Sequence, residues 1–241
     1  MADNRVVPGL AGKTAVVTGG RSGIGRACVE LLEASDCTVH VVDMQGPDPI
    51  SVTDRPALDA LAAKIGPTVD MLVNAAGILP QNVSISGIDM DDARRSYEVN
   101  VLGTLNTVQA FGEQLKAAKG AIVNIASQAA LVSLPAQGAY TATKGAVAAL
   151  TRSIAVDWAE DGVRANSVCP GFTITAMTEE FLKNDVFVNA AKKRMPLGRL
   201  LEASEIAAAI VFLASPLASG ITGVTLPVDA GWTAGEPALP W

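Results

Sequence analysis

The chain has 241 residues, of which 49% are hydrophobic and 17% charged, and its formal net charge is -6 at pH 7. This apolar content argues for one large core and against disorder. The acidic balance disfavours a nucleic-acid partner, because binding to a phosphate backbone requires a basic face. No apolar segment has the length of a signal-peptide core or of a membrane span. We therefore expect a cytoplasmic protein with neither a membrane nor a nucleic-acid partner.

Cysteine and histidine usage points away from a metal centre. The three cysteines, Cys28, Cys37 and Cys169, are an odd number without CxxC spacing, so neither a disulfide framework nor a zinc site is predicted. The single histidine, His40, stands inside the apolar run TVHVVD, which disfavours catalysis or metal binding by histidine. No metal site is expected.

Short β-branched runs alternate with longer alanine-rich stretches along the chain. The runs are apolar throughout rather than alternating, which indicates that helices cover both faces of a parallel sheet. We therefore predict one doubly wound α/β domain over residues 1–241, with a seven-stranded Rossmann-type sheet. Strands are expected at residues 13–20, 37–43, 48–52, 69–77, 120–127, 163–171 and 223–231. Helices are expected at residues 25–34, 56–65, 91–118, 140–161, 178–194 and 203–214.

The second and third predicted strands are unusually close in sequence. Only residues 44–49 separate Asp43 from the extended run at 50–52, whereas parallel neighbours normally need a crossover of a dozen or more residues. Six residues bridge that gap if they are nearly extended, at roughly 3.3 Å each, and Pro47 and Pro49 favour such a path. We predict a shortened connection in which the third strand is present and no helix precedes it.

The turn after the first strand carries a glycine pattern. In TGGRSGIGRA, Gly19, Gly23 and Gly25 are spaced as GxxxGxG. Glycines at this point allow a sharp turn and a close approach of backbone N–H groups to a pyrophosphate, and the N-terminus of the following helix favours the anion. Because ligands of such sheets bind beyond the carboxyl ends of the strands, the pattern predicts a dinucleotide site.

An acidic residue ends the second predicted strand. Asp43 lies 18 residues after Gly25, close to the spacing at which dinucleotide folds place an acid on the ribose hydroxyls. Its carboxylate would repel a 2′-phosphate, so NAD is predicted in preference to NADP. Arg21 is an opposing signal, because a cation in the glycine loop could pair with that phosphate. We give the carboxylate more weight because it stands where the ribose is expected.

With histidine excluded, tyrosine and lysine are the candidate proton-transfer residues. Tyr140 and Lys144 are four residues apart, so they share one helix face. An ammonium group beside a phenol is expected to lower the tyrosine pKa from about 10. Ser127 ends a predicted strand at the same edge, and Asn100 stands in mid-helix, where its propensity is poor. Taken singly, Ser127 could be a turn residue, Lys144 a solvated lysine and Asn100 a structural residue.

Several motifs in one order resemble the short-chain dehydrogenase/reductase family in its single-domain form. The resemblance extends over residues 9–231. It rests on TGGRSGIG at 18–25, NAAG at 74–77, Asn100, Ser127, YTATK at 140–144, PGFTIT at 170–175 and VDAG at 228–231.

The resemblance implies a role for each matched residue. Tyr140 would be the general acid/base, Ser127 would orient the substrate oxygen, Lys144 would bind the nicotinamide ribose and Asn100 would hold a water molecule of the proton relay. The implied cofactor-binding set is Gly19, Arg21, Ser22, Gly23, Ile24, Gly25, Asp43, Ser51, Val52, Asn74, Ala75, Ala76, Gly77, Tyr140, Lys144, Pro170, Gly171, Thr173 and Thr175.

Two positions depart from common family patterns. Ser22 stands where NADP-dependent members carry a basic residue, which supports NAD. Ser51, in SVTD, replaces the first acid of an Asp-Val-Thr-Asp-like sequence whose side chain faces the adenine. We therefore expect an open adenine edge with weaker contacts.

The segment after the sixth predicted strand is expected to close over the substrate, and we name residues 172–200 the lid segment. Its large apolar residues predict a pocket for a secondary alcohol or ketone of cyclic, aryl or steroid-like type, although the same side chains could simply pack the lid helices. They are Phe172, Met177, Phe181, Leu182 and Phe187.

The leading interpretation is an NAD-dependent alcohol dehydrogenase or ketone reductase. The alternatives are an NADPH-dependent 3-oxoacyl thioester reductase and a non-catalytic NAD-binding regulator or lyase-type member. By family analogy we expect a homotetramer, in which the Pro-rich tail at 232–241 reaches a neighbouring subunit.

Overall fold

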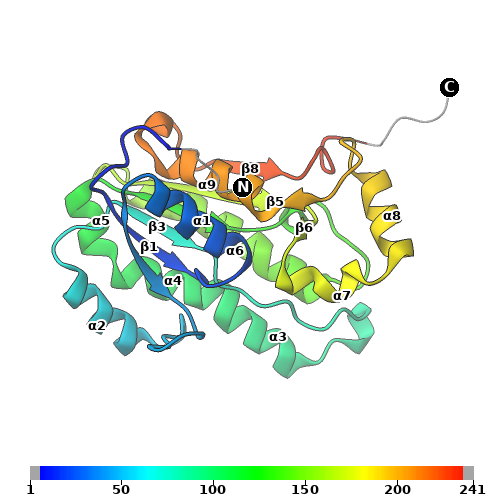
Figure 1. The fold of residues 1–241 in the computed structure, drawn as a ribbon. Coiled ribbons are helices and arrows are strands. Elements are labelled where there is room, and N and C mark those ends of the chain that lie inside the picture. The colour runs from blue at the N-terminus through cyan, green and yellow to red at the C-terminus, as the bar shows by residue number, and fades with distance from the viewer. Residues whose placement is uncertain (1–5, 236–241) are drawn as a thin grey trace.

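A computed structural model describes residues 6–235, and its central element is a six-stranded parallel sheet in the order β2-β1-β3-β4-β5-β8 (Figure 1). The strands are β1 (Thr14–Thr18), β2 (Thr38–Val42), β3 (Met71–Asn74), β4 (Ala121–Ile125), β5 (Arg164–Pro170) and β8 (Thr225–Val228). The chain moves outward from β1 to β2 and then returns to the other side of β1 with β3. The strand order therefore reverses at β1, and a ligand crevice is expected there.

Helices cover both faces of the sheet, as the apolar strands predict. One layer holds α1 (Gly23–Ala34) and α9 (Ala203–Ala214); the other holds α2 (Arg55–Ile65), α4 (Gly103–Ala110), α5 (Gly112–Ala118) and α6 (Gly138–Asp157). Successive strand residues enter opposite layers: Val17 packs toward α1 and α9, and Val16 toward α2, α4 and α6. Figure 1 shows the sheet between these two layers, and the doubly wound α/β prediction is confirmed.

The count of seven strands is wrong, because the segment Ile50–Val52 is not a strand. No helix lies between Asp43 and Ile50, as predicted, but the chain there is a series of bends. One backbone hydrogen bond, from the Ile50 N–H to the Asp43 carbonyl at 2.9 Å, closes this loop, but no ladder with β2 follows. The chain is attached to α4 instead: the Val52 carbonyl accepts a hydrogen bond from Asn106 Nδ2 at 3.1 Å. Val52 also packs on Gly103, where an added Cβ would lie 2.5 Å from Val52 Cγ2.

The connection from β2 to the next parallel strand is consequently not shortened. Residues 43–70 form an ordinary crossover that carries α2, and the strand it reaches is β3. Among the described residues no strand pairs with the outer side of β2, so β2 is one of the two edge strands of the sheet, with β8 at the other edge.

Two expected helices are divided. The stretch 91–118 forms α3 (Met90–Tyr97), a π-helical turn η2 (Glu98–Leu102), α4 and α5. The π turn is centred on Asn100, and such bulges occur frequently at functional sites. The stretch 178–194 forms the short α7 (Glu179–Leu182) and α8 (Asp185–Arg194).

The lid segment projects from one end of the molecule (yellow in Figure 1). It begins with β6 (Thr173–Ile174), which pairs with β7 (Leu201–Glu202) in a two-stranded sheet, and it continues through the 3₁₀ turn η4 (Ala176–Thr178) into α7 and α8. Further 3₁₀ turns are η1 (Ile85–Gly87), η3 (Gln128–Ala130) and η5 (Pro216–Ala218).

Two absences hold for the described residues. No helix within 6–235 is long and apolar enough to cross a membrane. Over the same range, no group of three or more His, Cys, Asp or Glu side chains is placed to hold a metal ion. Most of the predicted tail contact at 232–241 lies outside the described residues.

Candidate active site

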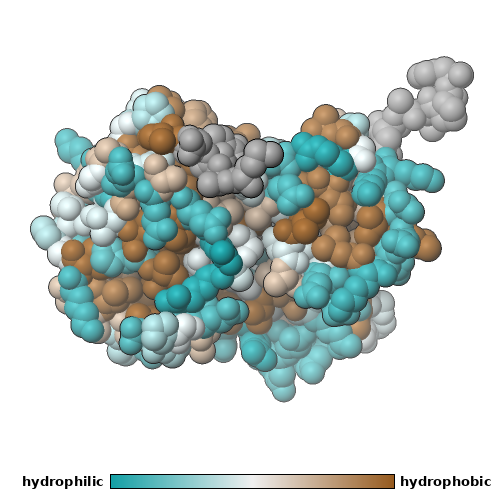
Figure 2. All heavy atoms as spheres, in the orientation of Figure 1, coloured by the Kyte–Doolittle hydropathy of each residue, from teal (hydrophilic) through white to brown (hydrophobic). Residues whose placement is uncertain are grey.

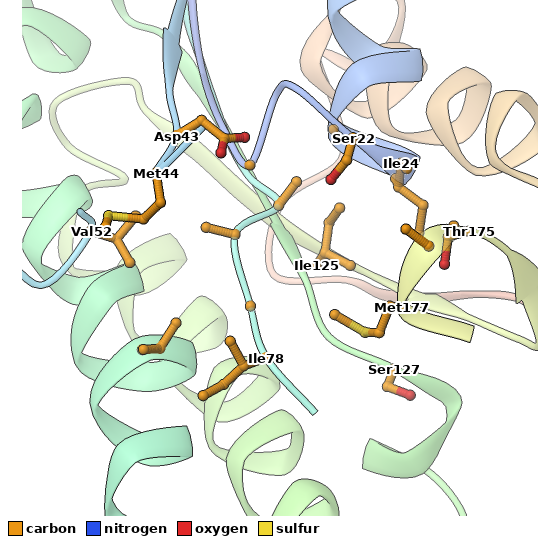
Figure 3. Close-up of a pocket in the computed structure, with 18 of the residues that line it drawn as sticks. Ser22, Ile24, Asp43, Met44, Val52, Ile78, Ile125, Ser127, Thr175 and Met177 are labelled. Atoms are coloured by element: carbon orange, nitrogen blue, oxygen red, sulfur yellow. The ribbon is translucent and has the colours of Figure 1, made fainter. Parts of the chain in front are cut away.

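A cleft of about 780 Å³ opens at the carboxyl ends of the strands (Figure 3). Figure 3 shows Asp43, Met44 and Val52 on one side of it and Ser22, Ile24 and Thr175 on the other. Most of the site residues predicted from the sequence line this one cleft: Gly19, Ser22, Gly23, Ile24, Gly25, Asp43, Ser51, Val52, Ala75, Ala76, Gly77, Ser127, Tyr140, Lys144, Pro170, Gly171, Thr173 and Thr175.

The glycine loop forms a backbone cradle that side chains would destroy. Gly19 has φ +65°, and a Cβ there would lie 2.9 Å from the backbone nitrogen of Ala76. A Cβ on Gly25 would collide with the carbonyl oxygen of Gly19. The loop thus folds tightly on itself and against the end of β3, leaving backbone N–H groups at the N-terminus of α1. This is the geometry that binds a pyrophosphate.

The acid after β2 is held by backbone donors. Asp43 Oδ2 accepts a hydrogen bond from the Arg21 N–H at 3.0 Å, and Oδ1 accepts one from the Gln45 N–H at 2.9 Å. The Arg21 side chain packs against Gly46 and does not line the cleft. The carboxylate, rather than the guanidinium, is therefore the charged group at this rim of the cleft.

Asn74, predicted as a cofactor residue, does not line the cleft. It is buried, and its Nδ2 donates to Asn124 Oδ1 at 2.9 Å, while its Oδ1 accepts from Thr107 Oγ1 at 2.7 Å. Asn124 Nδ2 in turn donates to Thr151 Oγ1 at 2.9 Å. These bonds join β3 and β4 to helices α4 and α6 beneath the site. The Asn74 side chain therefore holds the NAAG segment in place from beneath and does not face the cleft.

Ser127, Tyr140 and Lys144 come together at the inner end of the cleft. Ser127 follows β4 and caps η3, accepting the Ala129 N–H at 3.1 Å. Tyr140 lies on the first turn of α6, and Lys144 one turn later. Lys144 is buried; its Nζ donates to the Ile125 carbonyl at 2.8 Å and lies 5.8 Å from the centre of the Tyr140 ring.

The protonation equilibria of this pair differ from the sequence expectation. Burial raises the pKa of Tyr140 to about 12, against the effect of a hydrogen bond with Ser127, which lowers it. Burial also lowers the pKa of Lys144 to about 8. Loss of solvation disfavours both charged forms, and the ammonium group is engaged by the Ile125 carbonyl. The predicted lowering of the tyrosine pKa by Lys144 is therefore not found in this structure.

Asn100 lies behind the site rather than on its wall. Its Oδ1 accepts from the Ile78 N–H at 2.8 Å, and its Nδ2 donates to the Ile78 carbonyl at 2.9 Å and to Thr143 Oγ1 at 3.1 Å. A Cβ added to Gly77 would lie 3.1 Å from Asn100 Oδ1 and 3.5 Å from Lys144 Nζ. Both polar atoms thus border one small space over Gly77.

Other lining residues were missing from the sequence prediction. They are neighbours of predicted positions on the same loops and strand ends, or precede Asn100 by one to five residues on α3 and η2, so adjacency was the available signal. The set is Val42, Met44, Gln45, Ile50, Thr53, Ile78, Arg95, Glu98, Val99, Ile125, Ala126, Ala176 and Thr178.

The aromatic residues of the lid segment contact each other instead of the cleft. Phe172 lies 6.1 Å from Phe181 and 5.1 Å from Phe187, and Phe181 lies 5.3 Å from Phe187, between ring centres. Met177 does line the cleft. Figure 2 shows apolar residues gathered over the lid segment. Of the two interpretations of these side chains, packing of the lid helices holds for the phenylalanines, and a contribution to the cleft holds for Met177.

Comparison with known proteins identifies the family. A family model described as enoyl-(acyl carrier protein) reductase matches residues 19–233. The chain is 36% identical, over 96% of its length, to an uncharacterized short-chain type dehydrogenase/reductase of Sinorhizobium fredii, of which it spans 45%. It is 38% identical to galactitol 2-dehydrogenase (L-tagatose-forming) of Cereibacter sphaeroides, covering 96% of this chain and 99% of that protein.

The alignments with two further proteins cover nearly the whole of this chain and of the other protein. The 2,5-dichloro-2,5-cyclohexadiene-1,4-diol dehydrogenase of Sphingobium indicum is 35% identical, over 93% of this chain and 98% of that one. A Beutenbergia cavernae protein described as an NAD(P)-dependent gluconate 5-dehydrogenase, solved with bound NADP at low occupancy, superposes with a TM-score of 0.87 at 32% identity, over 94% of this chain and 99% of that one. The chain therefore belongs to the short-chain dehydrogenase/reductase family of oxidoreductases.

Proposed function

We propose that this chain is an NAD-dependent dehydrogenase of secondary alcohols, and a reductase of the corresponding ketones, with Tyr140 as the general acid/base. The observation that carries the proposal is the convergence of Ser127, Tyr140 and Lys144 at the inner end of a cleft whose outer end holds the glycine loop and Asp43. One cleft thus offers a dinucleotide cradle and a proton-transfer group together.

The residues of the cleft fit a nicotinamide dinucleotide. The cradle at Gly19 and Gly25 has no room for a Cβ, which leaves the backbone free to approach a pyrophosphate. Asp43 would accept hydrogen bonds from the hydroxyls of the adenosine ribose. Thr173 and Thr175 would contact the carboxamide and the phosphates. When bound, this cofactor supplies the hydride acceptor or donor, and the protein supplies position and a proton.

Tyr140 would exchange a proton with the substrate oxygen through its hydroxyl. In alcohol oxidation the tyrosine takes the hydroxyl proton, and in ketone reduction it returns one. The hydroxyl of Ser127, which hydrogen-bonds with Tyr140, would orient the same oxygen. Because the proton moves over a short hydrogen bond to a group fixed on α6, no histidine is needed.

Lys144 and Asn100 would renew the tyrosine proton. The ammonium group of Lys144 is buried with one carbonyl acceptor, so its remaining protons are available to a ribose and to a water molecule. The space over Gly77, bordered by Asn100 Oδ1 and Lys144 Nζ, suits that water. Asn100 would act as a positioning residue, held in place by both backbone groups of Ile78.

The substrate end of the cleft is lined largely by apolar side chains, including Ile78, Ile125 and Met177. Two relatives are named for hydroxylated substrates, an acyclic polyol and a cyclic diol. The apolar lining and the relative named for a cyclic diol support a cyclic alcohol or diol of modest polarity as the first class to test. The relative named for an acyclic polyol makes polyols the second class. We further propose a homotetramer, which light scattering after size-exclusion chromatography would measure.

The proposal is tested by a screen of cyclic, aryl and acyclic secondary alcohols with NAD, read as NADH absorbance. We expect turnover with at least one cyclic alcohol and slower turnover when NADP replaces NAD. Turnover confined to NADP would refute the cofactor assignment. Binding of NADH without turnover of any alcohol or ketone would instead favour a non-catalytic regulator or a lyase-type member.

A second candidate is an NADPH-dependent reductase of 3-oxoacyl thioesters. The description of the matching family model, enoyl-(acyl carrier protein) reductase, favours an acyl thioester substrate, although it names an enoyl group and not a 3-oxoacyl group. The neighbour solved with NADP favours the cofactor of this candidate. Reduction of acetoacetyl-coenzyme A with NADPH, faster than that of any simple ketone with NADH, would establish it in place of the first.

A further inference from the structure

The motif VDAG ends β8 in a turn that does not line the cleft, and we name residues 229–233 the C-terminal turn. Asp229 is buried and holds this turn from within. Its Oδ1 accepts the Gly231 N–H at 2.9 Å, and its Oδ2 accepts the Thr233 N–H at 2.9 Å and the Thr233 hydroxyl. One carboxylate thus satisfies three donors, and its loss would leave those donors without their partner.

The lid segment begins on this turn. Gly171, which directly precedes the lid segment and lines the cleft, lies against Asp229: an added Cβ would be 2.6 Å from Asp229 Cα. The Gly171 N–H donates to the Val228 carbonyl at 2.9 Å, and the Gly171 carbonyl accepts from Thr173 Oγ1 at 2.9 Å. The position of β6, the first element of the lid segment, therefore depends on the backbone at Asp229.

The lid segment also ends on this turn. Figure 1 shows the chain after β8 beside the segment that follows α8. Gly231 has φ +87°, and an added Cβ would lie 2.9 Å from Pro196 Cγ. The Leu197 N–H donates to the Ala230 carbonyl at 3.2 Å, and Ala230 is buried in the same core cluster as Leu200. Both ends of the lid segment thus rest on the C-terminal turn.

Between its two ends, the lid segment reaches the glycine loop at Thr175. A Cβ on Gly23 would lie 3.3 Å from Thr175 Cγ2. The Thr175 N–H donates to Thr178 Oγ1 at 3.1 Å, and Thr178 Oγ1 donates to the Thr173 carbonyl at 2.7 Å. Thr173 and Thr175 both line the cleft. The attachment of the lid segment therefore determines where two of its cofactor-facing residues lie.

We propose that the C-terminal turn is the seat of the lid segment, and that Asp229 is a positioning residue for cofactor binding that acts through Gly171 and Gly231. The effect on the cofactor rests on the proposed binding of a dinucleotide, whereas the seating itself does not. A segment held at both ends has few alternative positions, so loss of the seat should release the lid segment without unfolding the sheet. Affinity for the cofactor then falls with the fraction of chains whose lid is seated.

Limited digestion of the full chain by trypsin, without cofactor, measures the seating. Lys183 and Lys192 are exposed cleavage sites in the lid segment, and Lys64 on α2 is an exposed site outside it. Asp229→Ala should accelerate cleavage in the lid segment at least about fivefold and change cleavage after Lys64 less than about twofold. Asp229→Asn keeps one acceptor oxygen and should give an intermediate rate. Rates that are unchanged, or raised equally at all three sites, overturn the proposal.

Gly231→Ala tests the seat without changing a charge. Its Cβ should displace Pro196 and accelerate cleavage in the lid segment about threefold or more. Gly223→Ala is the matched control, because Gly223 has φ +74° but the nearest atom to its added Cβ is 3.7 Å away. Equal acceleration by both variants would assign the effect to backbone strain and refute the role of Gly231. If Asp229→Ala does not fold, this pair of variants decides the test.

Titration with NADH, followed by nicotinamide fluorescence, connects the seat to the proposed function. Asp229→Ala and Gly231→Ala should each weaken NADH binding at least about threefold, and Gly223→Ala should leave it within about twofold. Saturating NADH should slow cleavage of the lid segment in the natural chain, because a ligand stabilises the form that binds it.

The two measurements separate this inference from the proposed function. Faster cleavage of the lid segment with unchanged NADH affinity would refute the role of Asp229 in cofactor binding. A natural chain that binds neither NADH nor NADPH would refute the proposed function, and digestion would still decide whether the C-terminal turn seats the lid segment.

Discussion

The two ends of the cleft are built in different ways. At the inner end, Lys144 and Asn100 are buried and bonded to backbone groups of Ile125 and Ile78, and each stands on a helix. At the adenosine rim, the chain from Asp43 to Ile50 belongs to neither sheet nor helix, and residues 44–48 within it form exposed bends. The inner end is fixed by regular elements, whereas the rim depends on a few loop contacts.

This difference indicates where change is tolerated. Exposed loops vary at little cost to stability, whereas a buried polar network fails when one member is lost. We therefore expect substitutions at the inner end to reduce turnover strongly, and substitutions at the rim to change cofactor affinity moderately.

The largest effect is expected from Tyr140→Phe, which removes the hydroxyl and keeps the ring. Turnover should fall by about 10³-fold, the scale of a lost general acid/base, with the NADH dissociation constant unchanged. The other tyrosine, Tyr97, is exposed on α3 and provides the control Tyr97→Phe, which should retain activity. Substantial turnover by Tyr140→Phe, measured at saturating cofactor, would assign the proton transfer elsewhere.

Lys144→Met should separate activity from stability at the inner end. Turnover should fall by about 10²-fold. The unfolding free energy at pH 7 should rise by roughly 1–3 kcal/mol, because a buried ammonium is costly to desolvate. The pKa of Lys144 is lowered to about 8 in the folded state, so the unfolded state takes up the proton first as pH falls below about 10.5.

The stabilisation by Lys144→Met should consequently be complete below pH 8 and vanish as pH rises toward 10.5. Denaturant unfolding at several pH values measures it, with the exposed Lys64→Met as control. A variant that is less stable than the natural chain at pH 7 would mean that the bond to the Ile125 carbonyl outweighs the cost of burial.

The pH profile tests the inner end without mutation. With the pKa of Tyr140 raised to about 12, the phenolate fraction grows up to tenfold per pH unit throughout the usable range. Alcohol oxidation, measured as kcat/KM, should rise with pH and reach no plateau below about pH 10. A plateau near neutral pH would instead restore the sequence-based expectation that Lys144 lowers this pKa.

The smallest effect is expected at the rim. Ser51→Asp introduces the acid that the family pattern carries and keeps an acceptor for the Thr53 N–H, which now bonds Ser51 Oγ at 3.1 Å. One added hydrogen bond at an exposed site should tighten NADH binding about two- to fivefold. Ser219→Asp, at the opposite end of the sheet, controls for net charge. Unchanged NADH affinity would show that position 51 does not reach the adenine.

Predictions from the sequence were confirmed where the pattern within a single helix or strand was sufficient. The apolar strands predicted a covered parallel sheet, and the positions just after the strands predicted most of the cleft wall, because parallel strands end at one edge. The spacing of Tyr140 and Lys144 placed both on one helix face.

The failures concern long-range choices. The sequence of residues 50–52 is typical of a strand, but a strand forms only where its backbone pairs with a neighbouring strand. Here the Val52 carbonyl bonds Asn106 and the Val52 side chain packs on Gly103, both on α4. Asn74 belongs to the NAAG motif, whose other residues line the cleft. Its side chain instead forms hydrogen bonds with Asn124 on β4 and Thr107 on α4 and so supports the fold.

By itself, the sequence of this chain determined the fold class, the strand ends that meet at the cleft and the residue types available for proton transfer, because these depend on local pattern and spacing. Only the tertiary structure decided which side chains reach the cleft, how burial shifts the pKa values of Tyr140 and Lys144, and where the Arg21 charge lies. Those properties depend on neighbours distant in sequence, whose packing and desolvation no local pattern encodes.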